Sequence, residues 1–106
     1  MGIRETFLMA TFNRANHVTG IFTVSVGGIV GTVVETAFVA KVATETLSKA
    51  VVLCHNHTSG ATAPSEADKI LTLKIKEALK LLDCMLMDHL ILTETSHFSF
   101  AEEGIM

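Results

Sequence analysis

The feature that most constrains the fold is a short, uninterrupted apolar run at residues 50–55. A helix is predicted over residues 35–48, directly before this run, because apolar residues recur there with the period of one helix face. A second helix is predicted to start near Ser65, after a polar loop at 56–64. A short apolar run that follows a helix is typical of a buried strand in the centre of a sheet. The run therefore predicts an α/β fold.

The remaining segments predict further strands, which complete a mixed sheet. Residues 5–12 and 17–26 have strand-like composition, and the turn candidate at 13–16 would let them pair as a hairpin. The order of elements predicts a single-domain α/β protein whose mixed β-sheet is flanked by helices. Further strands are predicted at 29–34, 84–93 and 97–100.

Composition narrows the functional class. The chain has 106 residues, which fits one domain, and 49% of them are hydrophobic. The net charge of −3 gives no electrostatic reason to expect direct contact with nucleic acid or an anionic membrane. The longest apolar stretches fall short of the roughly 20 residues that span a bilayer. Two cysteines, each within an apolar run, favour reduced thiols and predict a cytoplasmic location.

The residues that carry chemistry follow the central strand. His55 ends this strand and His57 lies two residues on, so both imidazoles can point to the same side. Asp68 lies in the first turn of the next helix, which the intervening loop can return to the strand end. Two neutral imidazoles and one carboxylate form a good ligand set for Zn²⁺ and leave a fourth position open. The pattern therefore predicts a zinc site.

Each of these residues has a simpler interpretation. A pair of histidines alone would be typical of a polar surface loop. Ser65 and Asp68 also match a helix capping box, and both roles can hold together. Cys54 points away from His55 on a strand, which favours core packing over metal binding.

The spacing His-x-His-x(7)-Ser-x-x-Asp resembles that of the JAMM (MPN-plus) metalloproteases, and the surrounding residues resemble the RadC-like branch. The resemblance runs from about residue 5 to the end of the chain and implies a cytidine-deaminase-like JAB/MPN fold. We expect residues 1–106 to be one such domain, without the helix-hairpin-helix region that precedes it in full-length members. The matching segments are 12–16, 55–60, 64–68, 88–91, 98–100 and 102–104.

The resemblance also implies an activity, which is zinc-dependent hydrolysis of peptide or isopeptide bonds. His55, His57 and Asp68 would hold the metal, and Ser65 would hydrogen-bond the developing oxyanion or the attacking water. Thr58 replaces the proline that usually follows the second histidine, a change that removes no ligand.

The chain departs from the family pattern at the general base. The glutamate expected in the second strand falls on Thr23, whose hydroxyl cannot take a proton from water at neutral pH. Losing a general base typically costs about 10²- to 10⁴-fold in rate. Glu35 and Glu5 are the nearest substitutes in sequence. Glu35 begins a predicted helix, where the dipole favours a carboxylate in any case.

Asp88 and His89 adjoin on a predicted strand, so only one of them can face the site. Asp88 is predicted to orient a ligand histidine, and an exposed pair is the alternative.

Three functions follow from these expectations. The first is a zinc hydrolase that acts on a peptide or protein substrate. The second is a catalytically inactive metal-binding scaffold, which the threonine in place of the base supports. The third is a DNA-repair-associated accessory role, which the resemblance suggests and the acidic composition weakens. An edge strand at either end of the sheet also offers a surface on which two copies could pair as a homodimer.

Overall fold

The computed structural model describes residues 5–27, 32–57 and 61–106, and for residues 32–34 it describes the backbone alone. Five strands form one mixed sheet in the order β2-β1-β3-β4-β5. Strands β3 and β4 run parallel, and the other neighbouring pairs are antiparallel. The elements are β1 (Thr6–Phe12), β2 (Val18–Val26), α1 (Thr32–Glu45), β3 (Ala50–Asn56), α2 (Glu66–Leu81), β4 (Met85–Leu92) and β5 (His97–Ser99).

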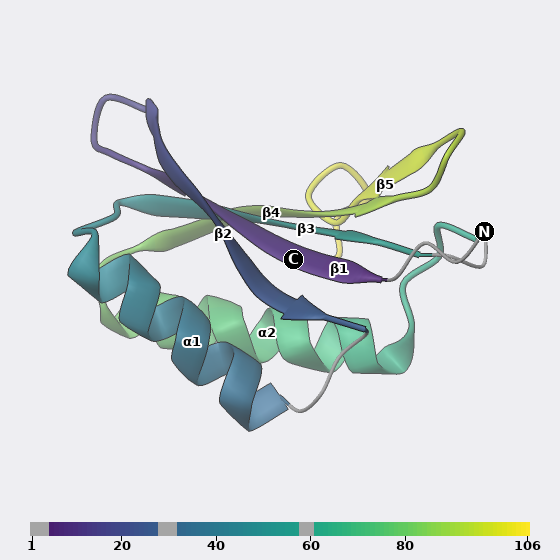
Figure 1. The fold of residues 1–106 in the computed structure, drawn as a ribbon, viewed down its shortest axis with the longest axis horizontal. Coiled ribbons are helices and arrows are strands. Elements are labelled where there is room, and N and C mark those ends of the chain that lie inside the picture. The colour runs from purple at the N-terminus through teal and green to yellow at the C-terminus, as the bar shows by residue number, and fades with distance from the viewer. Residues whose placement is uncertain (1–4, 28–31, 58–60) are drawn as a thin grey trace.

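Both helices cover the same face of the sheet, and they pack against each other there (Figure 1). Buried and half-buried side chains alternate along β1, where Phe7, Met9 and Thr11 point towards the helices. The same face of β3 carries Val51, Leu53 and His55, as the pairing of the two strands requires. The predicted α/β fold, with a mixed sheet flanked by helices, is confirmed.

The first helix differs from the prediction in its bounds. It begins at Thr32 and ends at Glu45, whereas the period of the sequence predicted residues 35–48. The predicted strand at 29–34 is therefore wrong for residues 32–34, and residues 29–31 lie outside the described residues. Two adjacent valines favour a strand only weakly, and packing can override such a preference. The helix ends early because Leu47 adopts a left-handed conformation (φ 53°), which lets the Ser48 amide bond the Ala43 carbonyl.

The core lies between the sheet and the two helices. Helix α2 contributes Leu71, Ile75 and Leu79, which recur every four residues and are fully buried. They meet Met9 of β1 and Leu53 of β3 in one continuous cluster. This cluster fixes the position of α2 against the sheet, and with it the start of the helix beside the end of β3.

Truncation of this core should destabilise the domain far more than truncation of the exposed helix face. We expect Ile75→Ala to lower the free energy of unfolding by about 2–5 kcal/mol, because it leaves a cavity under the sheet. Ile70 lies on the same helix but is 58% exposed, so Ile70→Ala should change stability by roughly 0.5 kcal/mol or less. Urea denaturation of both variants measures the difference. Equal losses would mean that α2 does not pack as described.

Candidate metal centre

Three side chains meet at the carboxyl end of β3. His55 is the penultimate residue of this strand, His57 follows it, and Asp68 belongs to the first turn of α2. His55 Nε2 lies 3.5 Å from Asp68 Oδ1, and His57 Nε2 lies 3.2 Å from Asp68 Oδ2. One potential ligand atom from each residue lies within 4.8 Å of the others, so the three residues could hold a metal ion. The structure thus brings together the three residues that the sequence predicts as ligands.

Local sequence explains the position of Asp68. Ser65 is the N-cap of α2, and its hydroxyl accepts a hydrogen bond from the Asp68 amide at 3.0 Å. In return, Asp68 Oδ2 accepts from the Ser65 amide at 2.8 Å, which completes the predicted capping box. The carboxylate is only 1% exposed, and the cap fixes it facing the two imidazoles. The Ser65 hydroxyl still has its own hydrogen to donate, and the residue is exposed.

A chain of hydrogen bonds behind His55 fixes its tautomer. The Thr72 hydroxyl donates to the Asp68 carbonyl at 2.6 Å, so it accepts from His89 Nδ1, also at 2.6 Å. Burial lowers the pKa of His89 to about 3, so this ring is neutral and its Nε2 carries a lone pair. That nitrogen lies 3.3 Å from His55 Nδ1 and accepts its hydrogen. The Nε2 of His55, which faces Asp68, must therefore carry a lone pair.

In His57 a different contact fixes the hydrogen on Nδ1. Its Nδ1 lies 3.0 Å from the carbonyl oxygen of Ala61, which can only accept, so Nδ1 carries the hydrogen. When His57 is neutral, its Nε2, like that of His55, presents a lone pair to the Asp68 carboxylate at 3.2–3.5 Å. Burial is the main cause that lowers the pKa of His55, which disfavours a proton there. In this state the two nitrogens and the carboxylate are three acceptors, between which a divalent cation would fit.

His89 belongs to this centre, although the sequence alone did not assign it a role. Its ring is fully buried and stacks on Phe7 and Phe100, with centroids 5.8 Å and 4.7 Å away. The predicted orienting residue, Asp88, instead accepts from the Ser99 hydroxyl at 2.6 Å and from the Ala101 amide at 3.0 Å. It thereby anchors the turn after β5. The available signal was the alternation along β4, which allows one of the two adjacent residues to face inward.

Thr23 is not brought to the cluster. A β-bulge in β2 leaves Val24 without a partner, so that Phe7 pairs with Ser25 and Leu8 pairs with Thr23. Paired residues share a face, which places Ser25 on the helix side and leaves Thr23 exposed on the opposite face of the sheet. That Thr23 corresponds to the family's glutamate stays a prediction.

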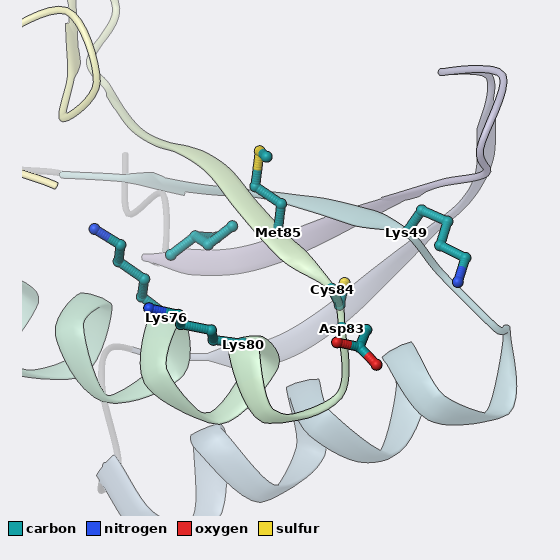
Figure 2. A pocket seen from close by; sticks show the side chains of 7 residues that line it. Lys49, Lys76, Lys80, Asp83, Cys84 and Met85 are labelled. Carbon is teal, nitrogen blue, oxygen red and sulfur yellow. The ribbon is translucent and has the colours of Figure 1, made fainter.

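A cavity of about 460 Å³ lies at the other end of the sheet, away from the histidines. Figure 2 shows Lys76 and Lys80 on one side of it and Lys49 on the other, so the three ammonium groups do not converge. It therefore lacks the converging polar groups that mark the metal centre. Its lining residues are Lys49, Lys76, Lys80, Asp83, Cys84, Met85 and Leu86.

Comparison with known proteins agrees with this geometry. A family model described as the RadC-like JAB domain matches residues 2–105. The chain belongs to the RadC-like JAB domain family. The predicted resemblance is thus confirmed, and the five-stranded mixed sheet with two helices is consistent with the JAB/MPN fold of that family.

Curated relatives of this RadC-like JAB domain carry the family name UPF0758. A UPF0758 protein of Flavobacterium johnsoniae is 46% identical over 101 residues, which are 95% of this chain and 44% of that protein. UPF0758 protein YfjY of Escherichia coli K12 is 41% identical over 103 residues, 97% of this chain and 64% of its own length. The chain therefore spans about half to two thirds of these relatives. Among the described residues, no helix is long and apolar enough to cross a membrane.

The Thr72–His89 chain predicts a loss of metal affinity without loss of a ligand. Thr72→Val preserves shape but removes the hydroxyl that fixes the His89 tautomer, so His55 loses its defined acceptor. We expect metal binding to weaken by about 10- to 100-fold, as measured by competition with a chromophoric chelator. Thr11→Val is the matched control, because Thr11 is equally buried but its hydroxyl lies 2.8 Å from Thr19. Equal metal affinities in both variants would contradict the role of the hydrogen-bond chain from Thr72 through His89 to His55.

Proposed function

We propose that this domain binds one Zn²⁺ through His55, His57 and Asp68 and hydrolyses peptide or isopeptide bonds. The observation that carries the proposal is the convergence of two imidazole nitrogens and one carboxylate, in which a hydrogen bond to the other ring nitrogen orients each imidazole and the helix cap holds the carboxylate. Two imidazoles and one carboxylate that leave an open coordination position are typical of catalytic zinc. Family membership supports the same reaction class.

Asp68, Ser65 and His89 have different roles around the bound ion. A bound ion would supply Lewis-acid chemistry, polarising the scissile carbonyl and activating water. The capping box holds Asp68 in place before any ligand arrives, so little reorganisation accompanies binding. Ser65 is exposed at the helix start and can donate its hydroxyl hydrogen to the oxyanion that develops on the substrate. His89 keeps the His55 ring in one orientation.

A second candidate is a metal-binding scaffold without hydrolytic activity. The exposed position of Thr23, on the face opposite to His55, favours it, because β2 then offers no inward carboxylate at that position. We propose a peptide or protein as the ligand in either case, in the cytoplasm, since a net charge of −3 does not favour nucleic acid. A DNA-repair-associated role would therefore act through protein partners, and a homodimer through an edge strand remains a further proposal.

Metal content tests the proposal directly. Protein purified without chelator and supplied with zinc should retain about one ion per chain. His57→Ala should abolish this retention, because it removes a ligand and leaves two. His97→Ala is the control, since His97 is 62% exposed on β5, away from the cluster. Elemental analysis of the three proteins gives the answer. An unloaded parent protein would mean that the three residues form an ion pair around a helix cap, and the hydrolase proposal would fall.

A further inference from the structure

Glu35 is a buried carboxylate that is not among the residues of the proposed metal centre. It lies in the first turn of α1 and is only 1% exposed. Its Oε2 accepts a hydrogen bond from the Ser25 hydroxyl at 2.7 Å. Its Oε1 has no hydrogen-bond partner among the residues that the structure describes. Leaving a buried acceptor unpaired costs stability, so an acidic group kept in this state is a candidate for function.

Strand pairing places this carboxylate on the same side of the sheet as the metal centre. Ser25 pairs with Phe7, and Phe7 pairs with His55, so all three side chains point towards the helices. Neighbouring strands lie about 4.8 Å apart, so Ser25 is roughly 10 Å from His55 along this row. The Phe7 ring contacts His55, with centroids 5.8 Å apart. Burial lowers the pKa of His55, and the charge of Glu35 is among the smaller effects that oppose this shift.

A glutamate at an inward-facing position of β2, such as that of Ser25, would extend its carboxylate from the sheet towards the helices. Helix α1 brings the Glu35 carboxylate to this location from the opposite direction, and Ser25 holds it there. The start of a helix also stabilises a negative charge, which makes such a buried carboxylate less costly. Ser25 is half-buried and fixes one oxygen, so the other oxygen is left to accept a proton.

We propose that Glu35 is the proton acceptor and donor of the hydrolysis, in place of the strand glutamate that this chain lacks. The proposal rests on the proposed zinc-dependent function. As water adds to the substrate carbonyl carbon, a C–O bond forms and one proton of the water passes to Glu35 Oε1. When the C–N bond breaks, Glu35 returns that proton to the leaving nitrogen, so the carboxylate is regenerated and the products are a carboxylic acid and an amine. Ser25 is a positioning residue that aims the carboxylate.

Two substitutions, each of which removes one negative charge, test the assignment. Glu35→Gln removes the acceptor, whereas Glu5→Gln removes the other carboxylate whose charge reaches His55 from outside the cluster. Zinc-loaded proteins would be compared in the hydrolysis of p-nitrophenyl acetate, whose leaving group needs no proton, so that only proton acceptance from water is measured. We expect Glu35→Gln to lower zinc-dependent kcat by about 10²- to 10⁴-fold. Glu5→Gln should retain the rate of the parent protein.

A binding measurement separates this role from a structural one. Acetohydroxamic acid binds a divalent metal as its anion and gives up a proton, so the acceptor should matter for its affinity as well as for the rate. Calorimetry should show weaker binding to Glu35→Gln than to the parent protein, while zinc content stays the same. Loss of zinc from a folded Glu35→Gln variant would assign Glu35 a structural role and overturn the proposal, as would a rate lost in Glu5→Gln instead.

Ser25 provides a second test if Glu35→Gln folds poorly. Ser25→Ala removes the hydrogen bond to Glu35 and should lower the hydrolysis rate, and Ser25→Thr, which keeps a hydroxyl, should restore it. Equal rates in both variants would overturn the positioning role. A parent protein that binds no zinc removes the proposed function and this inference together. A parent that binds zinc and hydrolyses the probe with unchanged rate in Glu35→Gln removes the inference alone.

Discussion

The carboxylate of Asp68 is the interaction on which the site depends. It closes the capping box of α2 and faces both imidazoles, so one side chain defines where the helix begins and where a cation would sit. A carboxylate that is 1% exposed must find compensation for lost hydration, and the Ser65 amide supplies part of it. The packing of Leu71 and Ile75 under the sheet then holds this helix start against the end of β3. Fold stability and ligand geometry are thus coupled through a single residue.

The second layer of the site comes from the same helix. Thr72 lies one turn after Asp68, so α2 supplies both a ligand and the hydroxyl that orients His89. His89 sits on β4, between the rings of Phe7 and Phe100, which keep water away from it. Because each donor in this chain has one acceptor, the imidazole of His55 is held in one tautomer. Such preorganisation is what a metal ligand needs when no other residue can correct its orientation.

Much of this could be predicted from the sequence, for physical reasons that differ between elements. The strand at His55 and the helix after Ser65 follow from hydrophobic period, and the capping pattern places Asp68 in the first turn of that helix. The position of Thr23 could not be foreseen, because the face of a strand residue depends on register and a bulge is invisible in local composition. The role of His89 could not be predicted from the sequence either, because the alternation of a strand does not determine which of two adjacent polar residues points inward.

The bulge at Val24 has a consequence for how such domains diversify. One extra residue reverses the side to which the positions just before it in β2 point, as far as a second register shift between Gly20 and Val18, while β1 keeps its pairing with β3. A strand of the same length without the bulge, which kept Ser25 opposite Phe7, would pair residue 23 with Met9 and so turn it towards the helices without altering its identity. Homologous positions can therefore serve opposite faces in two members of a family. Whether a member of the family can direct a carboxylate from this strand towards the helices then depends on the register of the strand as much as on residue type.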